Sequence, residues 1–91
     1  MPDQDQNQLD ARRRRLCYRA WHRGFLEMDM LLGRFADSHV ETFDESQLQR
    51  LELLLNQPDP DIYAWYCRRL AVPEHQENDV TNLFLNFSLP S

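Results

Sequence analysis

A chain of 91 residues has room for one small domain, and this size excludes a Rossmann fold, a barrel and a two-domain cleft enzyme. Only two glycines are present, which leaves little turn chemistry for β-hairpins, so the composition favours helices. The formal net charge is −5, yet all ten basic residues are arginine, and six of them lie in an acid-free stretch over residues 11–25. This balance argues against a nonspecific nucleic-acid binder, although the basic stretch suits an acidic partner.

The first ten residues are polar and acidic, and their composition predicts a disordered tail over residues 1–10. This start lacks the apolar segment of a secretory signal and the Arg-rich, acid-poor character of a mitochondrial presequence. No apolar run approaches the roughly 20 residues that a membrane span needs. We therefore expect a protein of the cytoplasm without a membrane span.

Two helices are predicted in the first half of the chain. Asp10 is a suitable N-cap, and residues 11–22 contain no helix breaker. Gly24 then interrupts the pattern. A second helix follows and ends near residues 37–39, because apolar residues recur there at helical spacing: Phe25, Met28, Leu31, Leu32 and Phe35.

Capping signals mark a third helix. Thr42 or Asp44 can cap it, with Glu45 or Gln47 in the capping-box position, and Pro58 stops it. Its predicted inner face is Leu48, Leu51, Leu54 and Leu55.

Asp59 and Pro60 then form a start signal, with the aspartate as N-cap and the proline at the first helical position. This fourth helix is expected over residues 60–70, with Ile62, Trp65, Tyr66 and Arg69 at helical spacing. A fifth is expected over residues 76–86, where Val80, Leu83, Phe84 and Phe87 repeat the apolar pattern. The predicted fold class is all-α: a compact bundle of five short helices in one domain over residues 11–88, followed by a tail over 89–91.

The reactive side chains do not form a recognisable catalytic or metal-binding motif. Cys17 and Cys67 are fifty residues apart, and the three histidines are scattered singly, so the close ligand pairs of a zinc site are missing. Cys17 and His22 lie about 140° apart around a helix. Without a Gly-rich phosphate loop or an HExxH motif, we expect no enzyme activity, no metal and no tightly bound cofactor.

The most unusual segment is residues 22–29. Gly24 costs about 1 kcal/mol relative to alanine inside a helix, but it permits a sharp turn or the close approach of another backbone. Arg23 and Glu27 are four residues apart, and Glu27 and Asp29 fall in the first turn of the next helix. The segment is therefore either helix-start chemistry with a surface ion pair or a partner-binding patch that a second surface can approach.

The arginine run over residues 12–15 also has two interpretations. It is either a solvated helix face or an arm that lies along phosphates with the help of Tyr18 and Trp21. No helix-turn-helix spacing follows it. Trp65 and Tyr66 are expected in the core, because so small a domain needs every large aromatic side chain.

The motif Arg23-Gly24-x-x-Glu27-x-Asp29, followed by Leu31, Leu32 and Phe35, resembles the motif of the SdhE family, small five-helix FAD assembly factors. Two further stretches are similar to that family: Phe43-Asp44-Glu45 and Leu54-Leu55-x-x-Pro58-Asp59-Pro60-Asp61-Ile62-x-x-Trp65. The resemblance covers residues 12–87. The chain departs from the family at His22, where a second basic residue is usual, and at Phe25, where methionine is usual.

The resemblance implies a chaperone that binds the flavoprotein subunit of succinate dehydrogenase, fumarate reductase or both. It promotes covalent attachment of FAD to a histidine of that subunit, so FAD is carried by the partner. The family's activity depends on Arg23, Gly24 and Glu27, which are then partner-binding residues. Arg19, Phe25 and Asp29 are expected to flank this contact, and the chain is expected to be a monomer.

The alternative that the residues leave open is a nucleic-acid-binding or antitoxin-like regulatory module that uses the basic first helix.

Overall fold

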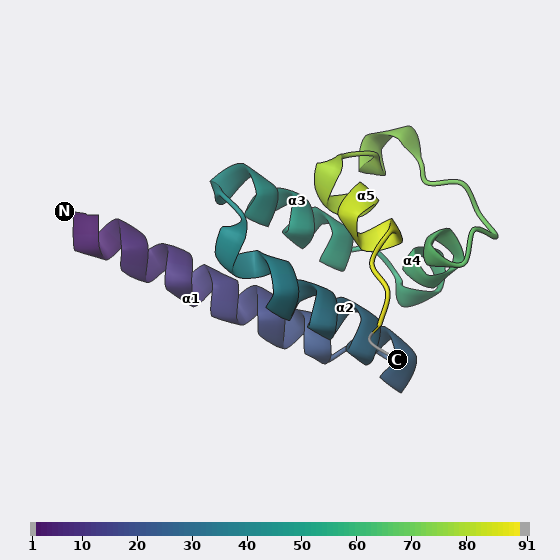
Figure 1. Cartoon of the computed structure of the whole chain (residues 1–91), viewed down its shortest axis with the longest axis horizontal. Coiled ribbons are helices and arrows are strands. Elements are labelled where there is room, and N and C mark those ends of the chain that lie inside the picture. Colours follow the sequence, from purple (N-terminus) through teal and green to yellow (C-terminus); the bar gives the residue numbers. More distant parts are fainter. Residues whose placement is uncertain (1, 90–91) are drawn as a thin grey trace.

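The computed structural model describes residues 2–89; residues 1, 90 and 91 lie outside the described part. Within it the chain is all-α, which confirms the predicted bundle of five helices (Figure 1). Two 3₁₀ turns, η1 and η2, connect them. The elements are α1 (Pro2–Trp21), α2 (Leu26–His39), η1 (Val40–Thr42), α3 (Glu45–Leu55), α4 (Asp59–Tyr66), η2 (Glu74–Gln76) and α5 (Asp79–Leu85).

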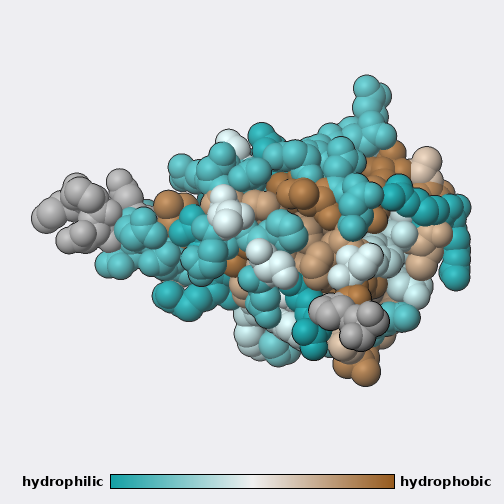
Figure 2. All heavy atoms as spheres, in the orientation of Figure 1, coloured by the Kyte–Doolittle hydropathy of each residue, from teal (hydrophilic) through white to brown (hydrophobic). Residues whose placement is uncertain are grey.

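Helix α1 is longer than the sequence predicts. The composition predicts disorder over residues 1–10, whereas the structure has helix from Pro2, and Asp10 lies inside α1 instead of capping it. No glycine or proline interrupts residues 3–21, and Asp10 accepts hydrogen bonds from the Gln6 amide (3.1 Å) and the Arg13 guanidinium (3.3 Å). The start of α1 projects beyond the body (Figure 1), and the part of α1 that Figure 2 colours is mostly hydrophilic. The limits of the single domain, 11–88, stay a prediction.

Helices α1 and α2 pack against each other along the longer axis of the molecule (Figure 1). Gly33 of α2 lies against the indole of Trp21, and a Cβ at this position would meet ring carbon Cδ2 at 2.2 Å. The close approach of the two helices therefore requires glycine here.

A single hydrophobic core joins all five helices. The predicted apolar faces of α2 and α3 are buried, with the exception of Phe25, which precedes α2 and is 40 % exposed. Leu83 of α5 was also predicted to face inward but is exposed. The buried apolar residues are Leu16, Ala20, Met28, Leu31, Leu32, Phe35, Ala36, Val40, Phe43, Leu48, Leu51, Leu54, Leu55, Ile62, Trp65, Val80 and Phe84.

Helix α3 begins with the predicted capping box. The Asp44 carboxylate accepts from the Gln47 backbone N–H at 2.9 Å, and the Gln47 side-chain oxygen accepts from the Asp44 N–H at 3.0 Å. Two orphan donors of the helix end are thus satisfied reciprocally.

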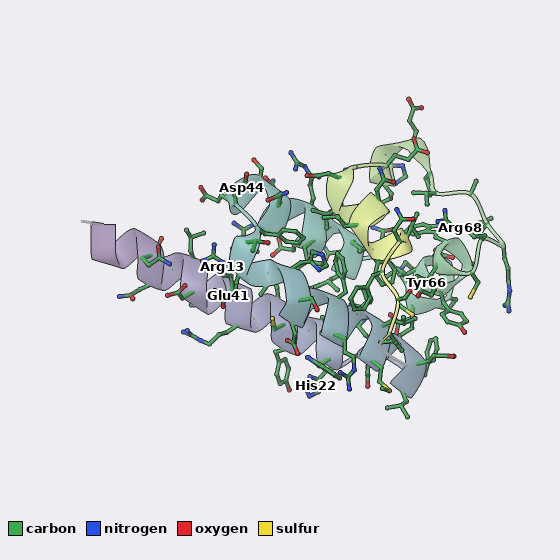
Figure 3. The ribbon with its side chains drawn as sticks, in the orientation of Figure 1. Arg13, His22, Glu41, Asp44, Tyr66 and Arg68 are labelled. Carbon is green, nitrogen blue, oxygen red and sulfur yellow. The ribbon has the colours of Figure 1, made fainter. Side chains whose placement is uncertain are left out.

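Helix α4 differs from its prediction at both ends. Its N-cap is Pro58, and Asp59 is its first residue, because the Asp59 side chain is engaged elsewhere. The helix ends at Tyr66 instead of residue 70. Two residues after this end, Arg68 (labelled in Figure 3) adopts a left-handed backbone conformation (φ 61°) that terminates the helix. Arg69 is consequently in an exposed loop.

Helix α5 is shorter than predicted, since residues 74–76 form η2 and Asn78 caps α5 by accepting from the Thr81 N–H. The chain after α5 is fixed by Tyr66, whose hydroxyl donates to the Phe87 carbonyl at 2.6 Å. No helix over the described residues is long and apolar enough to cross a membrane.

Candidate partner-docking site

The turn between α1 and α2, residues 22–25, carries the motif that the sequence singled out. Helix α1 ends at Trp21, and the ring of His22 turns back, with Nδ1 2.7 Å from the Tyr18 carbonyl oxygen and the two rings stacked (Figure 3). The backbone then runs through Arg23 and Gly24 to Phe25, which is the N-cap of α2 in an extended conformation.

Arg23 faces the protein and not the solvent. Only 10 % of its side chain is exposed, and its Nε donates to Oδ1 of Asp59 at 2.7 Å. Nη1 donates to the Leu55 carbonyl at 2.7 Å, and Nη2 donates to the Gln57 carbonyl at 3.0 Å. The sequence suggested an ion pair with Glu27 four residues on; the structure corrects this, because the charge partner is Asp59.

Gly24 and Asp29 belong to the same network. The Gly24 N–H donates to the second oxygen of Asp59, Oδ2, at 2.7 Å, and the Arg23 N–H donates to Oδ1 of Asp29. A Cβ on Gly24 would lie 3.1 Å from Asp59 Oδ2, which is tighter than an ordinary contact. Gly24 has no positive φ, so a side chain here is opposed by the nearby Asp59 carboxylate, which would have to give by a few tenths of an ångström, and not by backbone conformation.

Glu27 lies at the exposed start of α2 and is held by α4. The Tyr63 hydroxyl donates to its Oε2 at 3.0 Å, and this hydrogen bond is the main cause that raises the pKa of Tyr63 to about 12. The Phe25 ring meets the Tyr63 ring edge to face, with centroids 5.7 Å apart. Leu26, which stands between Phe25 and Glu27 in the sequence, is 72 % exposed.

We call the exposed group Gly24, Phe25, Leu26, Glu27 and the adjoining Tyr63 the docking surface. Its members combine two apolar side chains, one carboxylate and one phenol, a mixture suited to a protein interface. Of the six predicted partner-binding residues, the structure places Gly24, Phe25 and Glu27 on this surface. It places Arg23 and Asp29 beneath it.

The sixth residue, Arg19, reaches the far end of α3, where its Nη2 donates to the Asn56 side chain at 2.6 Å. Sequence reasoning missed Leu26 and Tyr63, which carried no motif of their own, and it assigned Asp59 to a helix cap and to a family motif but not to this site. No local signal marks Asp59 as the partner of Arg23, because the two residues are 36 positions apart.

The arginine run of α1 is not one continuous exposed face. Arg13 turns inward, donating from Nε to the Val40 carbonyl (3.1 Å) and from Nη2 to the Phe43 carbonyl (3.0 Å) (Figure 3). Arg14 and Arg15 are exposed. The structural role of Arg13 therefore interrupts the run.

Of the remaining features, only Cys67 touches the docking surface, through the side chain of Tyr63. A polar hollow of about 540 Å³ lies between α1 and α3 and is lined by Gln8, Leu9, Ala11, Arg12, Arg15 and Glu45. Cys17 and Cys67 are free thiols, and burial together with Asp37 raises the pKa of Cys17 to about 11. Among the described residues, no three His, Cys, Asp or Glu side chains gather as a metal site.

The sequence of this chain matches a known protein family and several of its members. Residues 14–88 match the model of the family described as "Flavinator of succinate dehydrogenase" (Sdh5). The chain is 43% identical over 77 residues to "Succinate dehydrogenase assembly factor 2, mitochondrial" of Dictyostelium discoideum, covering 85% of this chain and 55% of the relative. It is 41% identical over 71 residues to "FAD assembly factor SdhE" of Acetobacter pasteurianus, covering 78% and 65%.

A third relative, the assembly factor 2 of Danio rerio, is 38% identical over 82 residues, covering 88% of this chain and 52% of the relative. The chain thus spans about half to two thirds of the length of these relatives. The matched residues include the turn with Arg23 and Gly24, the docking surface and the Asp59 contact. The chain belongs to the SdhE family, the flavinators of succinate dehydrogenase.

Proposed function

We propose that this chain binds the flavoprotein subunit of succinate dehydrogenase and promotes covalent attachment of FAD to a histidine of that subunit. The observation that carries the proposal is the family match over residues 14–88, which contains the whole docking surface. The names of the relatives, a succinate dehydrogenase assembly factor and an FAD assembly factor, support it. A fumarate reductase flavoprotein is a second client in this proposal.

The docking surface has the physical properties that such a complex requires. Phe25 and Leu26 are exposed apolar side chains on adjacent positions, and burying them against a partner gives favourable free energy. Glu27 adds a carboxylate whose orientation is fixed by the Tyr63 hydroxyl, so little side-chain entropy is lost on binding. The missing side chain of Gly24 lets the partner approach the backbone.

In this proposal the chain contributes position and not covalent chemistry. The reacting histidine and the flavin belong to the flavoprotein. The bound helical domain holds the domains of the flavoprotein in place, so that this histidine and the flavin stay in reacting geometry. FAD is therefore carried by the partner, and this chain acts as a monomeric chaperone in the bacterial cytoplasm. The similarity to the bacterial assembly factor of Acetobacter pasteurianus supports the bacterial source.

The test is co-production with the flavoprotein subunit in a host that lacks its own assembly factor. Covalent flavin is read as fluorescence of the denatured subunit in a gel. We expect wild-type chain to give the fluorescent band and Gly24→Arg, which places a long side chain on the docking surface, to abolish it. Wild-type levels of covalent flavin with Gly24→Arg as the only copy would contradict the proposal.

A matched pair of leucines separates docking from general surface effects. Leu26→Ala and Leu83→Ala each remove an exposed leucine, from the docking surface and from α5 respectively. We expect lower covalent flavin with Leu26→Ala and an unchanged level with Leu83→Ala.

The nucleic-acid or antitoxin-like alternative stays a prediction. Arg14 and Arg15 remain available for it, while Arg13 is engaged inside the protein. Salt-dependent retardation of DNA or RNA by the purified chain would favour this alternative.

A further inference from the structure

Asp59, the first residue of α4, binds the turn that precedes α2. Its side chain is 13 % exposed, and both of its oxygens are used: Oδ1 accepts from Arg23 Nε and Oδ2 accepts from the Gly24 N–H, each at 2.7 Å. A charged group with two short, charge-assisted hydrogen bonds in a partly buried position fixes both partners firmly. The turn is thus attached to a helix that lies 35 residues further along the chain.

The backbone of the turn is held from a second side as well. The Arg23 N–H donates to the Asp29 carboxylate on α2, while the next N–H, that of Gly24, donates to Asp59 on α4. Two consecutive peptide N–H groups therefore point to two carboxylates from different helices. Phe25, Leu26 and Glu27 follow directly, so their direction is set by this pair of anchors.

Arg23 cannot act on a partner without leaving this arrangement. Its guanidinium makes three hydrogen bonds, to Asp59 and to the carbonyls of Leu55 and Gln57 at the end of α3. Turning outward would leave a partly buried carboxylate and two carbonyls without their donor, which is costly. The guanidinium therefore joins the α3–α4 corner to the turn.

We propose that Asp59 is the positioning residue of the docking surface, and that Arg23 acts through Asp59 and not by touching the partner. The carboxylate holds Arg23 and Gly24 so that Phe25, Leu26 and Glu27 are presented in the orientation that binds the flavoprotein. This inference rests on the proposed function. It also implies that a side chain at position 24 would disturb the anchor before any partner binds, because a Cβ there would lie 3.1 Å from Asp59 Oδ2.

The test measures affinity for the purified flavoprotein subunit by calorimetry in a cycle of Arg23→Ala, Asp59→Ala and the double variant. Residues that act as one unit have non-additive effects. We expect each single variant to weaken binding about tenfold, and the double variant to bind no more than about twofold more weakly than either single variant. A direct Arg23 contact would instead make Arg23→Ala cost the same factor in the Asp59→Ala background as in the wild type.

Two further measurements separate positioning from loss of fold. Asp59→Asn keeps the size of the side chain, and Asp61→Asn removes an equivalent exposed charge from the first turn of the same helix. By amide hydrogen exchange of the free chain, Asp59→Asn should expose the Gly24 N–H while the core amides of α2 and α3 keep their protection. Asp61→Asn should change neither the exchange nor the affinity, and Leu26→Ala should weaken binding with Gly24 exchange unchanged.

The outcomes distinguish this inference from the proposed function. If Asp59→Ala and Asp59→Asn bound the flavoprotein subunit as tightly as the wild-type chain does, the positioning role alone would be overturned. Additive losses in the cycle would overturn it too, because Arg23 would then be a direct contact. A wild-type chain that does not bind the flavoprotein at all would overturn the proposed function and this inference with it.

Discussion

Replacing Gly33 by alanine adds one methyl group where α2 packs against the Trp21 ring of α1. Two effects of opposite sign result. Alanine is the better helix former by about 1 kcal/mol, which would stabilise α2. The new Cβ, however, would lie 2.2, 2.5 and 2.7 Å from three carbons of the indole, against an ordinary carbon–carbon separation of about 3.5–4.0 Å.

The magnitude follows from how far the ring must move. Trp21 has to shift by more than about 1 Å, and its Nε1–H is held by a hydrogen bond of 3.1 Å to Asp37, so the shift also disturbs that bond. Overpacking typically costs about 1–3 kcal/mol, and the size of this overlap places Gly33→Ala at the upper end. After the propensity gain, we expect a net loss of about 2 kcal/mol. For a domain of this size that lowers the Tm by about 8–16 °C.

The assay is thermal and urea unfolding followed by circular dichroism. Ser38→Ala, at an exposed position of the same helix, serves as the control in which only propensity changes. In a Trp21→Ala background the clash is absent, so Gly33→Ala should become neutral or stabilise by up to about 1 kcal/mol. An unchanged or higher Tm for Gly33→Ala in the otherwise wild-type chain would refute the reasoning, because α1 and α2 would then have room to separate at no cost.

Three further substitutions or measurements test other parts of the fold. Asp44→Ala removes the capping box of α3 and should lower the free energy of unfolding by about 1 kcal/mol in urea; no loss would contradict the cap. Arg13→Ala leaves two carbonyls near η1 without their donor and should cost about 1–3 kcal/mol, whereas exposed Arg14→Ala should change stability by less than about 0.5 kcal/mol; equal losses would contradict the inward role. The rate at which iodoacetamide alkylates Cys17 should follow the thiolate, with a pKa of about 11 in the folded chain and 9.0 in the unfolded chain. Since the folded state holds this proton more tightly, stability falls as the pH rises from 9 to 11. The same alkylation profile with and without urea would contradict the burial.

Features that depend on neighbouring residues were predicted well. The capping box of Asp44 and Gln47, the inner face of α3 and the order of five helices all follow from spacing within one or two turns. The turn at Gly24 was also predicted, because a glycine is anomalous in a helical pattern wherever the rest of the chain lies. The predicted N-cap at Asp10 did not match, since α1 begins at Pro2 and Asp10 lies inside it.

The sequence by itself determined an all-α chain with a turn at Gly24 and a family motif around it, because helical periodicity and capping act over a few residues. The tertiary structure alone decided where the side chains of that motif lie and what they contact. Arg23 and Asp59 are 36 residues apart, so nothing in the local pattern distinguishes an arginine that pairs with Glu27 on the surface from one buried at the α3–α4 corner. Only the packing of α4 against the turn makes that choice, and it leaves Phe25, Leu26 and Glu27 facing outward.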